Sequence, residues 1–276
     1  MRKTTLGFVF SRSFLGAAVA VTLLLATVIP ALAINFGEPD GDAHPHVGLL
    51  VFDVGGSPSH RCTGTLISST VLLTAGHCTF GTSGGRVWFE SDVGAGIPGN
   101  GYPFAGGTSI EFSEIYTHPD YVDNAFYLHD VGIAILSEPV VLDTYGTLAD
   151  IGLLDDLSTR RGLQEQNFTV VGYGLQSVMP ELMVDLVRYQ GTVKLISSQG
   201  AAGIPKGVAV TLTNNPGQSH SGGTCFGDSG GPVFWGDSNV IAAVTSFGLN
   251  QNCAGLGGGY RVDTADDQAF ITGFLP

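Results

Sequence analysis

Gly227-Asp228-Ser229-Gly230-Gly231-Pro232 places a serine between small, flexible neighbours and directly after an acid. A serine hydroxyl is a weak nucleophile until a base removes its proton and nearby donors stabilise the resulting oxyanion. Glycines on both sides let the backbone bend, so that the hydroxyl and adjacent N–H groups can face one substrate atom. The same stretch is also typical of a surface turn. Its meaning depends on whether the chain supplies a base and an acid that orients it.

His77 is the strongest candidate for the base. It lies in Leu73-Thr74-Ala75-Gly76-His77-Cys78, after an apolar run and before a cysteine. A covalently anchored strand end holds a functional side chain in a fixed position. The other six histidines lie in loop-like stretches or beside a proline or an acid, which favours solvated or hydrogen-bonded roles: His44, His46, His60, His118, His129 and His220.

Asp130 is the candidate for the orienting acid. It opens the apolar run Val131-Gly132-Ile133-Ala134-Ile135-Leu136, and a carboxylate at the edge of a core is unfavourable without a partner. A turn-capping aspartate is the simpler interpretation of this pattern. Asp120 and Asp123 are rivals, but they lie in a polar loop with no apolar run after them.

These three motifs together resemble the chymotrypsin/trypsin-like serine endopeptidases. Each motif alone has modest specificity, but the order His, Asp, Ser at these separations is highly specific. The resemblance extends over nearly all of the chain after residue 33. It is weaker from about Glu90 to Thr117 and from about Gln176 to Gln218.

The resemblance implies a catalytic role for each matching residue. Ser229 would be the nucleophile, and His77 would act first as general base and then as general acid. Asp130 would hold the imidazole in the required tautomer and stabilise its charged form. The backbone N–H groups of Gly227 and Ser229 would form the oxyanion hole.

The resemblance also implies a set of substrate-binding residues. Ser246, Phe247 and Gly248 match the segment that backs the buried acid and pairs with the substrate main chain. Gly223 lies six residues before the nucleophile, at the base of the primary pocket, where trypsin-like members carry an acid. Gly248 and Gly258 match positions where the pocket walls are small. An open, uncharged pocket would prefer large apolar or aromatic residues to Lys or Arg.

The composition and strand pattern indicate an all-β protein. The chain has 276 residues, of which 41 are Gly, about twice the average fraction. About a dozen short β-like runs are separated by turn residues, and only Thr264–Gly273 is typical of a helix, which suggests a sandwich or barrel. The resemblance implies two antiparallel six-stranded β-barrels with the active site in the cleft between them. The N-terminal barrel would span about residues 34–158, and the C-terminal barrel and helix about 159–276.

The first 33 residues are typical of a secretory signal peptide. Arg2, Lys3 and Arg12 precede the apolar run Phe14–Ile29, and Pro30-Ala31-Leu32-Ala33 ends in a small-residue cleavage pattern. An uncleaved membrane anchor is the alternative, but the run is short for a span. We therefore expect a secreted, extracellular protein with no stable membrane association after cleavage.

Cleavage after Ala33 would start the chain at Ile34-Asn35-Phe36-Gly37. Mature members of the family begin with a similar Ile-x-x-Gly, and their terminal ammonium pairs with the acid before the nucleophile. Here that pair would be Ile34 and Asp228. A turn residue is the simpler interpretation of Asp228. The ion pair implies that signal peptidase itself produces the active enzyme.

Four cysteines all follow residue 33. An even number in an exported chain indicates disulfides, with three possible pairings. The spacings and the oxidising compartment argue against a metal site. The resemblance implies the pairs Cys62–Cys78 and Cys225–Cys253.

The net charge of the chain after residue 33 excludes some classes of binding partner. Residues 1–33 hold three basic residues and no acids, which leaves 8 Lys and Arg against 24 Asp and Glu, a net charge near −16. Such acidity opposes binding to nucleic acid and to anionic membranes. Protein or peptide substrates and a monomeric enzyme are expected, and no sequence pattern indicates a cofactor or a required metal.

Two other functions remain open from the sequence. A non-catalytic binding relative would share the fold, but such relatives usually lose a triad residue, and all three are present. An esterase of another fold would place its serine in Gly-x-Ser-x-Gly, a pattern that residues 227–231 formally satisfy. That fold orders the triad Ser, acid, His, the reverse of the order here.

Overall fold

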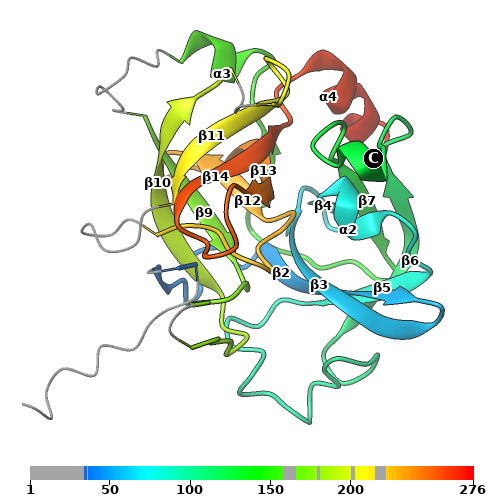
Figure 1. The fold of residues 1–276 in the computed structure, drawn as a ribbon. Coiled ribbons are helices and arrows are strands. Elements are labelled where there is room, and N and C mark those ends of the chain that lie inside the picture. The colour runs from blue at the N-terminus through cyan, green and yellow to red at the C-terminus, as the bar shows by residue number, and fades with distance from the viewer. Residues whose placement is uncertain (1–33, 36, 158–165, 179–180, 200–202, 215–221) are drawn as a thin grey trace, which may run out of the picture. The chain divides into compact units, whose positions relative to one another are not determined.

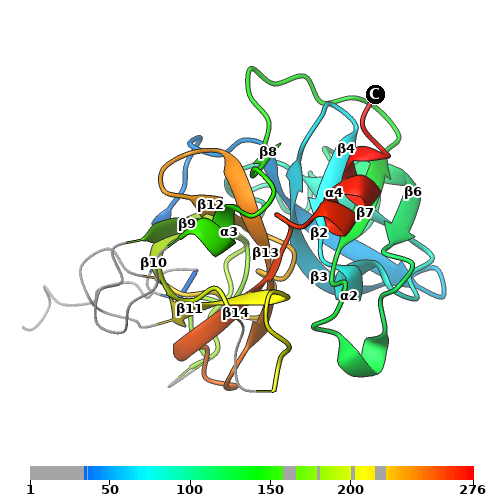
Figure 2. The ribbon, with the colours of Figure 1, turned by 90° about the horizontal axis from the view of Figure 1, so that it is seen from above.

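The computed structural model describes residues 34–35, 37–157, 166–178, 181–199, 203–214 and 222–276. The predicted signal peptide and part of the predicted boundary between the barrels lie outside these residues. No helix within them has the length and hydrophobicity needed to cross a membrane. Two closed antiparallel β-barrels lie side by side (Figures 1 and 2), which confirms the predicted fold class.

The first barrel closes in the strand order β2-β3-β4-β7-β6-β5. The central residues of β2 are buried, and its Leu50 and Phe52 pack with Leu72 and Val87 inside the barrel. The strands are β2 (Val47–Val54), β3 (Ser57–Leu66), β4 (Val71–Thr74), β5 (Gly84–Trp88), β6 (Ile110–Thr117) and β7 (Gly132–Leu136). The helix α2 (Gly76–Thr79) follows β4 directly.

The second barrel closes because β9 pairs with both β10 and β12. Its core is formed by apolar residues such as Phe168, Val170, Val193, Val210 and Val233. The strands are β9 (Asn167–Gly172), β10 (Tyr189–Ser197), β11 (Ala209–Asn214), β12 (Pro232–Trp235), β13 (Val240–Gly248) and β14 (Gly255–Arg261). The short strands β1 (Glu38–Pro39) and β8 (Thr147–Leu148) pair with β10 and β13.

The described part of the chain contains few helices, and they are short. They are η1 (Asp123–Ala125), α3 (Leu153–Asp156) and α4 (Ala265–Thr272), in addition to α2. The predicted helix at Thr264–Gly273 corresponds to α4. Ile271 of α4 packs with Val71, Leu73 and Ile133 of the first barrel, so the C-terminal helix crosses back from the second barrel (Figure 2).

Strand β14 begins earlier than the sequence pattern indicated. Gly255–Gly259 lacks the β-branched residues that favour strands. The segment is nevertheless extended because β11 and β13 pair with it on both sides. The Phe247 ring covers the backbone of Gly258 directly, which replaces the packing that glycine cannot provide.

A buried arginine ties the two barrels together. Arg188, next to β10, is 1% exposed and forms an ion pair of 2.7 Å with the buried Asp40. Its guanidinium also donates to the carbonyl oxygens of Val47 and Phe89 in the first barrel and to the hydroxyl of Tyr173. Because these partners come from both barrels, the arginine fixes one barrel against the other.

His46 is expected to make the protein unstable in acid. The sequence suggested a solvated or hydrogen-bonded role for His46, but the residue is fully buried, and neither ring nitrogen has a hydrogen-bond partner among the described residues. Burial, with the nearby charges of His44 and Arg188, lowers its pKa from 6.5 to about 4. Below pH 6.5 the unfolded chain therefore binds a proton that the folded chain excludes, and stability is lost as pH falls from 6.5 to 4.

The His46 contribution amounts to roughly 3 kcal/mol over this interval. Urea unfolding of the wild type and of His46→Leu at several pH values measures this contribution as the difference between the two proteins, which should grow as pH falls from 6.5 to 4. An equal slope in both proteins would show that another group causes the loss.

Candidate active site

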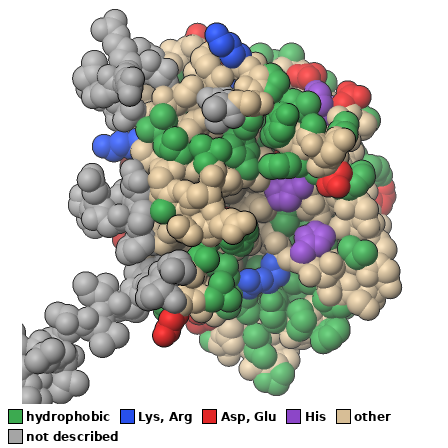
Figure 3. Space-filling view, viewed as in Figure 1, with side chains coloured by type: hydrophobic (Ala, Val, Ile, Leu, Met, Phe, Trp, Pro, Cys, Tyr) green, Lys and Arg blue, Asp and Glu red, His purple; other side chains and the backbone are tan. Residues whose placement is uncertain are grey.

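Two of the three predicted catalytic residues line one cleft, and the third, Asp130, is buried behind His77. His77 lies in α2, Asp130 precedes β7, and Ser229 lies in the turn before β12. The cleft has a volume of about 980 Å³, and both His77 and Ser229 line it. In the space-filling view, histidine side chains and a basic side chain lie together in the hollow at the centre of the face (Figure 3).

Asp130 holds the imidazole of His77. Its fully buried carboxylate accepts a bond from the His77 backbone N–H at 2.7 Å. The Nδ1 atom of His77 lies 2.9 and 3.1 Å from the two carboxylate oxygens, and the Ser246 hydroxyl donates to one of them at 2.6 Å. These contacts leave Nε2 of His77 as the nitrogen available toward the cleft.

The electrostatics around His77 favour its protonated form. Burial lowers the pKa of the imidazole, but the charge and hydrogen bond of Asp130, together with the charge of Asp123, outweigh burial. The pKa of His77 is therefore raised above its ordinary value of 6.5. A raised pKa strengthens the base that would take a proton from a serine.

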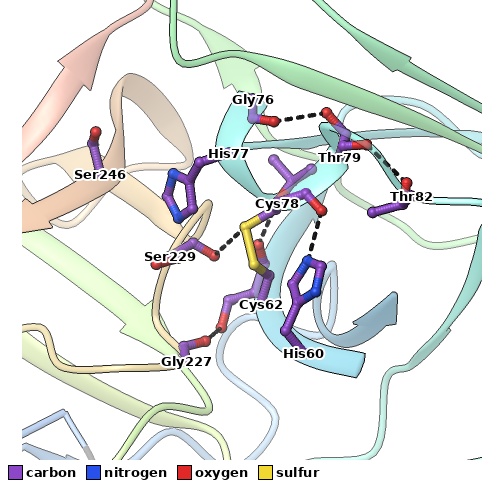
Figure 4. The surroundings of a disulfide bond; sticks show 12 residues. His60, Cys62, Gly76, His77, Cys78, Thr79, Thr82, Gly227, Ser229 and Ser246 are labelled. Atoms are coloured by element: carbon purple, nitrogen blue, oxygen red, sulfur yellow. Dashed lines mark hydrogen bonds between the residues drawn. A yellow bond between two sulfur atoms is a disulfide. The ribbon is translucent and has the colours of Figure 1, made fainter. Parts of the chain in front are cut away.

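The turn that carries Ser229 leaves two N–H donors free. Among the described residues, neither the Gly227 N–H nor the Ser229 N–H donates a hydrogen bond. Figure 4 shows the His77 ring directed toward Ser229. Gly227 has φ of 100° and Gly230 has φ of 78°, and a side chain at Gly230 would collide with Thr74. Glycine is thus required at both positions.

The structure contains the disulfides Cys62–Cys78 and Cys225–Cys253, which confirms that the cysteines are paired. The first joins β3 to the helix that carries His77 (Figure 4). Cys225 and Cys253 both line the cleft, so the second bridge braces the wall beside Ser229.

Asp228 and Ile34 are both buried, but among the described residues of the full-length chain no hydrogen bond or ion pair joins them. The Asp228 carboxylate accepts bonds of 2.8 Å from the N–H groups of Gly174 and Cys225. Burial outweighs these bonds and raises the pKa of Asp228 to about 7. Ile34 packs against Gly222. Its nitrogen is a peptide nitrogen here, so the charge pair stays a prediction.

The predicted substrate-binding residues fall into two groups. Ser246, Phe247 and Gly248 line the cleft. Gly223 and Gly258 are not among the described residues that line the cleft. The buried side chain of Asn214 lies against Gly223, and the ring of Phe247 covers Gly258. The sequence carries no signal for Asn214, because the fold alone brings the end of β11 to this position.

Thr63 is a site residue that sequence reasoning missed. Its hydroxyl donates to the Gly227 carbonyl at 2.9 Å and accepts from the Tyr173 N–H at 3.2 Å. Its own N–H donates to the Ser229 carbonyl at 2.8 Å. Thr63 therefore clamps the nucleophile turn onto the first barrel. A threonine in a buried strand has no distinguishing pattern in the sequence.

Thr63→Val is expected to destabilise the protein by roughly 1–3 kcal/mol, because it leaves the buried Tyr173 N–H without an acceptor. Thr65→Val is the matched control. It lies in the same strand and is 1% exposed, but its hydroxyl has no partner among the described residues, so the change should be neutral. Urea unfolding compares the two variants, and equal losses would contradict the proposed clamp.

Comparison with known proteins agrees with this geometry. The Trypsin family model matches residues 37–266. Brachyurin of Leptuca pugilator is 30% identical, and the match covers 76% of this chain and 83% of brachyurin. Trypsin beta of Drosophila erecta is 25% identical over 70% of each chain.

Two further comparisons set limits on the likeness. The serine protease Hayan of Drosophila melanogaster is 25% identical over 79% of this chain, which spans only 35% of Hayan's length. The solved structure of HL collagenase has a TM-score of 0.66 at 19% identity and covers 86% of this chain and 96% of its own, so it supports the fold alone. The family model matches most of the chain, and the chain therefore belongs to the trypsin family of serine-type endopeptidases.

Proposed function

We propose that this chain is a secreted serine endopeptidase that cleaves peptide bonds through an acyl-enzyme. The observation that carries the proposal is the arrangement around Ser229. His77, hydrogen-bonded to Asp130, lies beside Ser229 in the cleft, and the N–H groups of Gly227 and Ser229 are free. This arrangement supplies a base, an orienting acid and an oxyanion site at one point. The mature enzyme is proposed to be an extracellular monomer of residues 34–276, made of the two barrels.

Catalysis would proceed in two halves. The Ser229 hydroxyl attacks the substrate carbonyl carbon while Nε2 of His77 takes its proton. The Gly227 and Ser229 N–H groups stabilise the oxyanion, and loss of one such donor costs about 3–4 kcal/mol. Imidazolium then protonates the leaving amine. Water repeats the same steps to release the acid and restore Ser229.

A fluorophosphonate probe tests this assignment. The secreted protein should form a covalent adduct on Ser229, mapped by mass spectrometry, and Ser229→Ala should abolish it. Correctly processed protein that forms no adduct would favour a binding function for this fold.

We further propose that the enzyme cleaves after large apolar or aromatic residues. No acid stands at Gly223 to attract Lys or Arg. The cleft also carries exposed apolar side chains, with Phe226 57% and Leu249 50% exposed. A panel of peptides that differ only at the residue before the scissile bond should give the highest kcat/KM for Phe, Tyr or Leu. Preference for Arg or Lys would overturn the proposal.

A further inference from the structure

Three potential metal ligands converge beside the catalytic acid. His118 follows β6, Asp120 lies two residues later, and His129 immediately precedes Asp130. One ligand atom of each of these three residues lies within 4.8 Å of the others. The two imidazoles are stacked, with ring centroids 4.7 Å apart and an angle of 16° between the planes. The sequence had suggested ordinary solvated or hydrogen-bonded roles for both histidines.

The nitrogens of this cluster are not fully satisfied. Nδ1 of His129 is buried and has no hydrogen-bond partner among the described residues. Nδ1 of His118 accepts a long bond of 3.2 Å from the Asp120 N–H, so its lone pair faces the turn that carries Asp120. A buried polar atom without a partner is uncommon and often marks a missing water or ion.

Charge around the cluster favours a cation. Asp266, in the first turn of α4, interacts electrostatically with both His118 and His129. Figure 2 shows α4 beside β6 and β7, which border the cluster. Two imidazoles with one or two carboxylates form a ligand set that suits Zn²⁺ and similar ions.

The distances require only a modest adjustment. Ligands of a tetrahedral zinc ion lie about 3.3 Å apart, given metal–ligand bonds of about 2.0–2.2 Å. The side chain of Asp120 is exposed and can rotate toward the imidazoles. His118 is held more firmly, because it is 6% exposed and its ring packs edge-on against Phe270.

We propose that His118, Asp120 and His129 bind a divalent transition-metal ion of the Zn²⁺ class, and that binding slows the peptidase. The residues that follow two of these ligands in the chain belong to the active site. Asp130 follows His129 and bonds to His77. Tyr121 follows Asp120 and lines the cleft.

The coupling passes through a tightly packed segment. His129 has φ of 51°, and its carbonyl accepts the Val131 N–H at 2.8 Å. Gly76, next to His77, packs so closely that a Cβ there would lie 3.2 Å from the His129 oxygen and 3.0 Å from the Val131 nitrogen. Drawing His129 toward a metal would therefore shift Asp130, and a misplacement of about 1 Å can cost about a hundredfold in rate.

Metal binding and its effect on activity are tested separately, because only the second rests on the proposed function. Co²⁺ serves as the binding probe on the full secreted protein, since tetrahedral coordination by nitrogen and oxygen gives a visible absorption band. We expect saturable binding of one ion per chain, competed by Zn²⁺. Zn²⁺ should then lower kcat with little change in KM, because none of the three ligands lines the cleft.

His129→Asn and Asp120→Asn are the test variants. Asparagine tolerates the left-handed backbone at position 129, and Asp120 is exposed, so both proteins should fold, as the melting temperature will verify. Each should bind Co²⁺ at least about tenfold more weakly and resist Zn²⁺. Asp143→Asn removes an exposed acid outside the cluster and should behave like the wild type.

Three results would overturn the proposal. Absence of the Co²⁺ band in folded wild-type protein would exclude the site. Unchanged Co²⁺ binding in both test variants would place the ion elsewhere. Zn²⁺ inhibition that persists at the same Zn²⁺ concentration in both variants would show that the inhibitory ion binds elsewhere, for example at the catalytic imidazole of His77. If Co²⁺ binds as expected and the protein shows no peptidase activity, the site stands and the proposed function fails.

Discussion

Asp130→Asn is expected to lower kcat about ten-thousand-fold, the size of loss that the equivalent change causes in the trypsin family. The carboxylate accepts from His77 through both the backbone N–H and Nδ1. An amide at this position can present its own N–H to Nδ1, which places the imidazole proton on Nε2. That nitrogen then cannot accept the proton of Ser229.

The pH dependence of kcat/KM should also move. Neutral His77 is the active form, so wild-type activity is lost as pH falls through the raised pKa of His77. In Asp130→Asn the burial that lowers this pKa remains, while the main charge that raises it is gone. The acid limb of the profile should therefore shift to lower pH.

Asp123→Asn provides the matched control for charge. Asp123 raises the pKa of His77 through its charge alone, with no hydrogen bond to the ring. We expect a small shift of the acid limb and a change in kcat of only a few-fold. Similar losses of kcat in the two variants would mean that Asp130 acts only as a distant charge and does not set the tautomer.

The position of the N-terminus of the mature chain is expected to have the second large effect on activity. Enzyme that begins at Ile34 should exceed a chain that retains Ala33 by roughly two to three orders of magnitude in kcat/KM. A buried ion pair that loses one partner costs about 3–5 kcal/mol, and one added residue displaces the ammonium by about 3.8 Å. Peptide hydrolysis by the two purified proteins measures the difference.

The proposed ion pair between Ile34 and Asp228 should also change how the free energy of unfolding depends on pH. Without the ammonium, the pKa of Asp228 is raised from 3.8 to about 7 by burial. The folded chain then holds a proton that the unfolded chain releases near pH 4, so stability falls as pH rises from about 4 to 7, by roughly 4 kcal/mol in total. The ammonium of Ile34 would remove this loss by stabilising the carboxylate.

The difference in melting temperature between the two proteins should therefore be small at pH 4 and largest at pH 7 to 8. Asp228→Asn in both backgrounds is the control, since it removes the titrating group and should abolish the pH-dependent difference. N-terminal sequencing of the secreted protein complements this test. A mature chain that starts elsewhere than at Ile34 would refute the proposed processing.

The motifs around His77, Asp130 and Ser229 could be predicted because each is a short run of neighbouring residues. Their chemistry is local: glycines that permit φ of 100° at Gly227, or a cysteine beside the histidine. Strand positions could be predicted where a run rich in β-branched and apolar residues is bounded by turn residues, as at Val47–Val54 and Tyr189–Ser197. The strand at Gly255–Gly259 could not, because its extended form depends on its neighbours.

The sequence by itself determined the order of the catalytic residues, the pairing-competent cysteines and the all-β class, because these depend on contiguous residues and their intrinsic preferences. Only the tertiary structure decided which distant groups meet. It placed Thr63 against the nucleophile turn, Asn214 behind Gly223, and His118 beside His129. Such contacts arise from strand register and barrel closure, so no local pattern of residues records them.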